Sequence, residues 1–155
     1  MHPLTVAAIL VWLNLLFAGL LAGEEFVIRF GVRGPLAAVE PRTQIELRQA
    51  LIRKLQVLVP TIFFLALLAG VAATALGGRG HGLDLRCAGV LALLVFIGVT
   101  LGGTVPINKA ALAWDSSAPP EEWRALVARW EALDTVRTWA ALAAFALFLA
   151  GALAG

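Results

Sequence analysis

The chain has 155 residues, of which 61% are hydrophobic and 14% are charged, and its formal net charge is +2. Soluble domains are roughly 45–50% apolar and about 25% charged, so this composition excludes an ordinary soluble domain. The small net charge excludes nucleic-acid binding through a basic face, and the single cysteine, Cys87, excludes an intramolecular disulfide and a Cys-x-x-Cys site.

Four long apolar runs predict four membrane-spanning helices, because a helix needs about 20 mostly apolar residues to cross a bilayer. The runs cover residues 4–23, 55–76, 83–105 and 135–153. A secretory signal normally carries Lys or Arg before its apolar run, and none precedes the first run here, so we expect a permanent span there. The expected fold class is all-α: an integral membrane four-helix bundle with cytoplasmic helical extensions, forming a single transmembrane domain over residues 1–155.

The first helix is expected to continue past its apolar run until Gly31, Gly34 and Pro35 break it. After a loop over residues 32–42, a capping-box pattern at Thr43 predicts the start of the second helix. Apolar residues then alternate with charged ones, which predicts an amphipathic extension leading into the second span. The apolar residues are Ile45, Leu47, Leu51, Ile52 and Leu55, and the charged ones are Glu46, Arg48, Arg53 and Lys54.

A glycine-rich stretch at residues 77–82 predicts a tight connection, so the second and third spans should be antiparallel neighbours. Pro106 is expected to end or bend the third helix. Ser116 or Ser117 is the expected cap of the last helix, with two prolines in its first turn. From Trp123 onward, apolar residues recur at helical spacing into the fourth run, so the last helix should project beyond the bilayer.

Lys and Arg side chains gather in the links between the first and second spans and between the third and fourth spans. The positive-inside rule places such links in the cytoplasm. We therefore expect a multi-pass protein of the cell membrane, with both large links cytoplasmic and both termini outside.

The histidines are His2, at the chain start, and His81, in the glycine-rich stretch, so no predicted span carries one. A bis-histidine haem inside the bundle therefore cannot be built from one chain. We expect His81 to be solvated, and His2 could bind a metal only with help from another chain. The sequence leaves cofactors undetermined; a metal or haem, if one is bound, is expected at the charged layer described next or shared across a dimer.

Charged and polar residues flank the spans at one level on the predicted cytoplasmic side. They are Glu24, Glu25, Arg29, Arg53, Asn108, Lys109, Asp134 and Arg137. Helical spacing puts Glu25 on one face with Arg29, and Asp134 on one face with Arg137, so each couple can form an ion pair. The layer is either a belt of interfacial ion pairs or the polar floor of a pocket with apolar walls.

A few other polar and aromatic side chains lie within or next to the spans. Asn14, near the middle of the first span, is expected to bond a neighbouring helix, with a ligand contact as the minority interpretation. Trp130 and Trp139 are expected to pack between helices or to wall an aromatic site.

Two short segments carry a more specific pattern. Residues 103–109 read Gly-Thr-Val-Pro-Ile-Asn-Lys, and residues 130–138 read Trp-Glu-Ala-Leu-Asp-Thr-Val-Arg-Thr. With the Pro-Pro turn between them, they resemble the anthrone oxygenase-like family of four-helix membrane proteins. That family typically has Pro-x-Asn-x-x-Leu after the third span, which Pro106, Asn108 and Leu112 approximate.

The family also has Trp-x-x-x-His-x-x-Arg at the start of the fourth span. Trp130 and Arg137 match this element, and Asp134 stands where the family pattern often has His. The difference keeps a proton acceptor and removes an imidazole. The resemblance covers the whole chain in topology and implies the activity of the best-known members, in which oxygen oxidises a phenolic anthrone to a quinone.

The leading hypothesis is an oxygenase-like enzyme acting on a lipophilic aromatic or quinone-type small molecule held between the helices. In this hypothesis Glu25 or Asp134 removes a proton from the substrate, and Arg137 stabilises the resulting anion. The residues expected to bind the substrate are Asn108, Arg53, Trp130 and Asn14.

Two other classes of function stay open. One is a small proton-coupled transporter or channel working as a dimer, and the other is a non-catalytic scaffold whose Gly- and Ala-rich helix faces are its interfaces. The expected partners are the lipid bilayer and a small lipophilic molecule, with a homodimer left open and nucleic acid excluded.

Overall fold

The computed structural model describes residues 6–77, 80 and 82–154, and in these residues it contains helices and no strand. Four helical segments are long and apolar enough to cross a membrane: Val6–Ala37, Pro41–Leu76, Gly82–Leu112 and Trp123–Leu153. The predicted all-α fold with four membrane helices is therefore confirmed. The predictions for His2 and His81 lie outside the described residues.

The first helical segment does not break at its glycines, so that prediction is wrong. Helix α1 (Val6–Val27) passes through a π-helical segment, η1 (Ile28–Val32), into α2 (Arg33–Ala37). The wider π turn accommodates one extra residue, so the chain stays helical through Gly31. Pro35 lies in the first turn of α2, where a missing N–H costs little.

Helix α3 (Pro41–Leu76) begins two positions before the predicted cap at Thr43. Glu40 is the N-cap residue, and Pro41 occupies the first turn, which suits its fixed φ and its lack of an N–H. Thr43 Oγ1 instead donates a hydrogen bond to Glu40 Oε1 over 3.1 Å. The helix then continues through Pro60 as one element.

The third segment also runs past its predicted end. Helix α4 (Gly82–Val99) leads through a second π-helical segment, η2 (Thr100–Thr104), into α5 (Val105–Leu112). Pro106 lies in the first turn of α5, where its missing N–H costs little. The third helix therefore ends at Leu112 rather than near Pro106.

The last helix, α6 (Trp123–Leu153), has Glu122 as its N-cap, so the prediction of Ser116 or Ser117 is wrong. Asp115 Oδ1 accepts hydrogen bonds from Ser117 N over 2.8 Å and from Ser117 Oγ over 2.7 Å. These bonds hold the pKa of Asp115 below its usual range and form a local turn that occupies both side chains. The helix therefore starts only after this turn and the two prolines.

The helices pack in two close pairs, α4 with α6 and α1 with α3, and α1 also packs along α6. Small residues allow this close approach. Phe148 of α6 inserts between glycines of two other helices, since an added Cβ at Gly70 or at Gly89 would lie 2.9 Å from its ring. Phe63 and Phe96 stack at a centroid distance of 5.4 Å in the same core.

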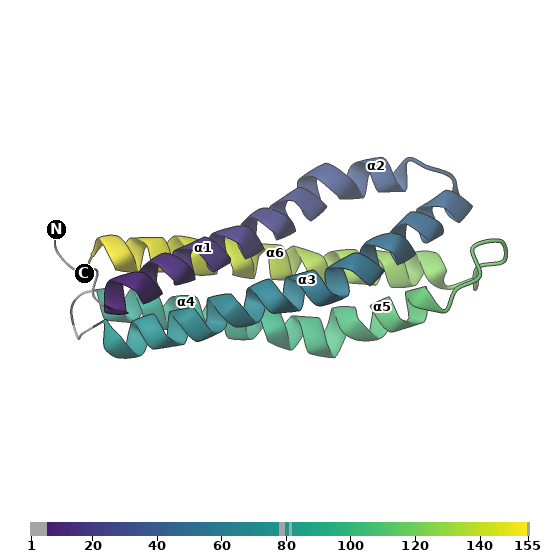
Figure 1. Cartoon of the computed structure of the whole chain (residues 1–155). Coiled ribbons are helices and arrows are strands. Elements are labelled where there is room, and N and C mark those ends of the chain that lie inside the picture. The colour runs from purple at the N-terminus through teal and green to yellow at the C-terminus, as the bar shows by residue number, and fades with distance from the viewer. Residues whose placement is uncertain (1–5, 78–79, 81, 155) are drawn as a thin grey trace.

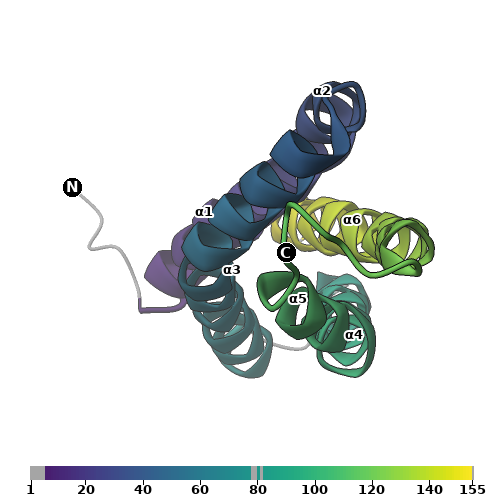
Figure 2. The same ribbon diagram turned by 90° about the vertical axis from the view of Figure 1, so that its right-hand side faces the viewer.

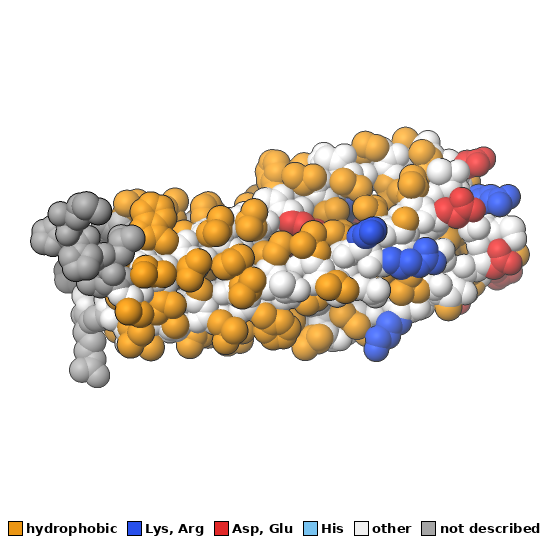
Figure 3. Space-filling view, in the orientation of Figure 1, with side chains coloured by type: hydrophobic (Ala, Val, Ile, Leu, Met, Phe, Trp, Pro, Cys, Tyr) orange, Lys and Arg blue, Asp and Glu red, His pale blue; other side chains and the backbone are white. Residues whose placement is uncertain are grey.

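One end of the bundle differs from the other. The start of α1, the end of α3, the start of α4 and the end of α6 lie together at one end (Figure 1). At the opposite end, α2 and the start of α3 lean away from α5 and α6 (Figures 1 and 2). The charged side chains visible in Figure 3 gather toward this splayed end, and hydrophobic side chains cover much of the other described part of that face.

Candidate functional site

A cavity of about 600 Å³ lies where the bundle opens. This volume is within the range of roughly 300–1,000 Å³ that is typical of small-molecule sites. Its charged and polar lining residues are Glu24, Glu25, Arg33, Arg48, Gln56, Thr100, Thr104, Asn108, Lys109, Trp130, Asp134 and Arg137. The apolar lining includes Phe63, Phe64, Leu67, Phe96, Ile97 and Leu101. The cavity therefore combines polar groups with an extensive apolar wall.

Both π-helical segments border this cavity. Ile28 and Val32 of η1 line it, and so do Thr100 and Thr104 of η2. Single π turns inside α-helices are rare and are frequent at functional sites, because the wider turn shifts the side chains that follow it. Neither segment was predicted from the sequence.

Arg137 is the centre of the charged layer. It donates a hydrogen bond to Glu25 Oε1, and its NH1 atom lies 4.0 Å from Asp134 Oδ1. Glu25 is 2% exposed and Asp134 is 1% exposed, so both carboxylates are buried. The guanidinium of Arg137 also lies 4.7 Å from the centroid of the Phe96 ring. The predicted pairing of Asp134 with Arg137 is therefore present.

The predicted pairing of Glu25 with Arg29 is replaced by contacts to α6. Arg29 donates to Thr135 Oγ1, and the partner of Glu25 is Arg137. Arg29 lies in η1, where the wider turn removes the usual alignment of residues four apart. Arg33, just beyond, binds Glu131 over 2.7 Å and lies 3.9 Å from Asp134.

The three carboxylates that line the cavity keep acceptor capacity. Glu24 Oε2, Glu25 Oε2 and Asp134 Oδ2 are each buried without a hydrogen-bond partner among the described residues. A buried carboxylate oxygen is costly to leave unpaired, so an acidic proton on a bound molecule would be favourable there. This end of the cavity is thus suited to accepting a proton next to a fixed positive charge.

The structure brings together most of the residues predicted for the site. Glu25, Asp134, Arg137, Asn108 and Trp130 all line the cavity.

Two predicted substrate-binding residues lie elsewhere. Arg53 is exposed and is not among the lining residues. Asn14 is 2% exposed and lies against Gly70 of α3, where an added Cβ would be 3.0 Å from Asn14 Nδ2. Asn14 therefore packs against a neighbouring helix and does not line the cavity, and its Oδ1 atom has no hydrogen-bond partner among the described residues.

Arg48 is the lining residue that the sequence pattern assigned to the wrong face. The prediction grouped it with the charged side of the second helix, yet it is 8% exposed and its guanidinium lies 5.3 Å from the Trp130 ring centroid. The sequence did contain a pattern that indicates an inward-facing Arg48, because Ile45, Arg48 and Ile52 recur at helical spacing. All three are buried in the structure. A charged residue that shares a helix face with apolar residues is expected to be buried with them.

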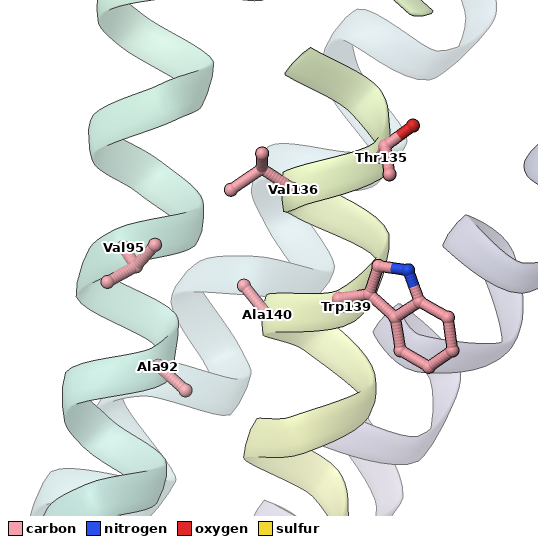
Figure 4. Close-up of a pocket in the computed structure, with 6 residues that line it drawn as sticks. All are labelled: Ala92, Val95, Thr135, Val136, Trp139 and Ala140. Carbon is pink, nitrogen blue, oxygen red and sulfur yellow. The ribbon is translucent and has the colours of Figure 1, made fainter. Parts of the chain in front are cut away.

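A second hollow lies on the outside of the bundle. Ala92 and Val95 of α4, together with residues of α6 that include Val136 and Trp139, line this groove (Figure 4). Trp139 is 58% exposed and Val136 is 45% exposed, and no lining residue is charged. The groove lacks the chemistry of the inner cavity and suits contact with lipid.

In the part of the chain that the structure describes, no cluster of three or more His, Cys, Asp or Glu side chains is arranged to hold a metal ion. The carboxylates of the cavity are instead interleaved with Arg33 and Arg137.

The family model for anthrone oxygenases matches residues 48–147, which is more than half of the chain. The chain belongs to the anthrone oxygenase family. The match extends from Arg48 in α3 to Leu147 in α6, so it contains Asn108, Asp134 and Arg137. In this anthrone oxygenase family member, Glu24 and Glu25 precede the matched region. No curated protein and no solved structure matches the chain.

Proposed function

We propose that this member of the anthrone oxygenase family is a membrane enzyme that uses dioxygen to oxidise a lipophilic phenolic or anthrone-type molecule bound in the inner cavity. The observation that carries the proposal is a group of three carboxylates next to Arg137 on the cavity wall: Glu25 and Asp134 are buried and Glu24 is partly buried. Each has one oxygen without a hydrogen-bond partner among the described residues. Family membership supports the same reaction class.

The chemistry begins when a carboxylate accepts a proton from the benzylic methylene of the substrate. Glu25 and Asp134 are the first candidates for this base, and Glu24, which lines the same cavity, is the third. The electron-rich carbanion then gives electrons to dioxygen, and a carbon–oxygen bond forms as a hydroperoxide. Loss of a second proton from the same carbon expels water and leaves a carbonyl group. One methylene and one dioxygen thus yield one quinone carbonyl and one water.

The surroundings of the carboxylates favour the first step. Charge that develops on the substrate oxygen during deprotonation is stabilised most where donors are fixed and water is excluded. Arg137 is held by Glu25 and by the Phe96 ring, so its guanidinium is positioned before substrate binds. Asn108 and Trp130 line the same space and are proposed to orient the aromatic body. Arg53 and Asn14 receive no direct role, because neither lines the cavity.

The test is turnover of a hydroxylated anthrone by the purified protein, followed by oxygen uptake and by quinone absorbance. Variants Glu24→Gln, Glu25→Gln and Asp134→Asn remove one proton acceptor each with little change in size. We expect at least one of them to lose about 10²-fold or more in rate, the usual contribution of a general base. Glu121→Gln, at an exposed position in the connection before α6, is the matched control.

Wild-type rates in all three amide variants would overturn the proposal. Loss of proton-coupled flux in the same variants, in a protein that turns over no anthrone, would assign the carboxylates to transport instead.

A further inference from the structure

Arg48 is a buried cation without a carboxylate of its own. The side chain is 8% exposed, and its Nε atom has no hydrogen-bond partner within the described ranges. The ion pairs found between described residues use Arg33, Arg42 and Arg137, and none uses Arg48. Glu131 and Asp134 attract the Arg48 guanidinium, but neither pairs with it within 4 Å. A buried guanidinium without a directly bound anion is costly, so an anion that bound it would be favoured.

Trp130 offers a second unused donor at the same place. Its Nε1 atom is buried without a hydrogen-bond partner in the described part of the chain, and its ring lies under the Arg48 guanidinium at 5.3 Å. The two residues come from different helices, α3 and α6, and both line the inner cavity. Two adjacent donors without partners, on residues that line one cavity, favour an acceptor supplied by a bound molecule.

The carboxylates of the cavity are directed toward other cations. Glu25 binds Arg137, while Asp134 lies 4.0 Å from Arg137 and 3.9 Å from Arg33. Glu131, which attracts Arg48 electrostatically, forms its ion pair with Arg33 over 2.7 Å. The position next to Arg48 and Trp130 is thus left for the charge of a ligand.

We propose that Arg48 and Trp130 bind an anionic oxygen of the cavity ligand, so that the preferred ligand is an organic anion on an aromatic body, a carboxylate or an ionised phenol. The anionic group would lie against these two donors, and the apolar body would extend along Phe63, Phe96 and Leu67, which line the same cavity. A planar guanidinium suits this role because it can bind a carboxylate through two parallel hydrogen bonds. The inference rests on the proposed function in taking this cavity as the substrate site.

The test is equilibrium binding to the full chain in phosphatidylcholine nanodiscs, with empty nanodiscs subtracted. The probes are anthracenecarboxylate and the uncharged anthracenecarboxamide, which share one ring system and nearly one shape. Wild-type protein should bind the carboxylate more tightly, and Arg48→Gln should weaken its binding by about 10- to 100-fold, as expected for loss of a charged hydrogen bond. Binding of the carboxamide should change little. Binding of a hydroxyanthracene is then measured at pH values below and above the pKa of its hydroxyl group. Tighter binding of the ionised form would show that a phenolate, and not only a carboxylate, can be the anionic group.

Three further variants keep the result interpretable. Trp130→Phe keeps an aromatic ring and removes the indole N–H together with the fused pyrrole ring, so it should lower carboxylate affinity by a smaller factor than Arg48→Gln and should change carboxamide affinity less. Arg48→Lys keeps the charge and should restore part of the preference. Arg53→Gln removes an exposed arginine from the same helix and should leave both affinities unchanged.

Equal affinity of the wild type for the two anthracene probes would overturn the inference, as would equal weakening of both by Arg48→Gln. The two proposals fail separately, because binding is measured without turnover. If the protein prefers the carboxylate through Arg48 but oxidises no anthrone, this inference is supported and the oxygenase proposal is contradicted. If the protein oxidises anthrone but shows no such preference, the oxygenase proposal is supported and this inference is contradicted.

Discussion

At the scale of the residue, this protein keeps several charges inside a membrane-spanning bundle, which is costly unless each meets a partner. Glu25 and Arg137 meet each other, and Asp134 lies near both Arg137 and Arg33. The partners come from different helices, so the network also ties α1 to α6. Stability and the proposed chemistry therefore depend on the same side chains.

Arg137→Met is expected to lower the free energy of unfolding by about 3–5 kcal/mol, because it leaves buried carboxylates without their cation. Adding Glu25→Met to that variant should recover part of the loss, since one unpaired charge is then removed. Tryptophan fluorescence during denaturant titration in detergent measures both. Arg129→Met, at an exposed position of the same helix, is the control and should be nearly neutral. An Arg137→Met protein as stable as the Arg129→Met protein would show that the pair contributes no net stability.

Helix geometry also explains why Arg48 lines the cavity although Arg53 was predicted to bind the substrate. Arg48 and Arg53 both belong to α3, but five positions along a helix correspond to a rotation of roughly 140° around its axis. Only one of the two can face the cavity. The apolar residues at Ile45 and Ile52 decide that it is Arg48, because they set the buried face.

At the scale of the element, close approach of helices depends on glycine. Phe148 of α6 is held between Gly70 of α3 and Gly89 of α4, with an added Cβ at either position 2.9 Å from the ring. The ring cannot move away from one glycine without meeting the other. This contact therefore fixes how α3, α4 and α6 pack against one another.

Gly89→Ala is expected to destabilise the protein by about 1–3 kcal/mol through overpacking, and Phe148→Leu in the same chain should relieve part of that loss. Gly98→Ala is the matched control from the same helix, because no side chain lies within 4 Å of the added Cβ. The control should be neutral or stabilising by about 0.5–1 kcal/mol, since alanine favours helix more than glycine does. Thermal unfolding in detergent compares the variants, and equal effects at the two glycines would contradict the packing argument.

At the scale of the whole molecule, the charged side chains on the face shown in Figure 3 gather toward the splayed end of the bundle, whereas Asp84 and Arg86 lie near the start of α4 at the other end. The connections from α2 to α3 and from α5 to α6 lie at that end (Figure 1). We propose that this end faces the cytoplasm, because Lys and Arg next to membrane spans are retained there.

The orientation can be tested in cells with the Cys87→Ala chain as background. A cysteine introduced by Ser117→Cys, in the connection before α6, should react with a membrane-impermeant maleimide only after permeabilisation. A cysteine introduced by Gly80→Cys, between α3 and α4, should react in intact cells. Both positions are exposed, so accessibility of the side chain does not limit either reaction. The opposite labelling pattern would invert the proposed topology.

The sequence by itself determined the helical class, the four spans, the level of the charged layer and the family motifs around Asn108 and Arg137. These features are local, because the bilayer requires long apolar runs and confines charge to their ends. Only the tertiary structure decided which charges meet and which residues face the cavity. Glu25 binds Arg137 rather than Arg29, and Arg48 faces inward rather than Arg53. For Glu25 the physical reason is helix phase: Arg29 lies in a π turn, which adds a residue within the helix and changes which side chains align. Helix α3 has no π turn, and Arg48 faces inward because it shares the buried face that Ile45 and Ile52 set by packing against other helices.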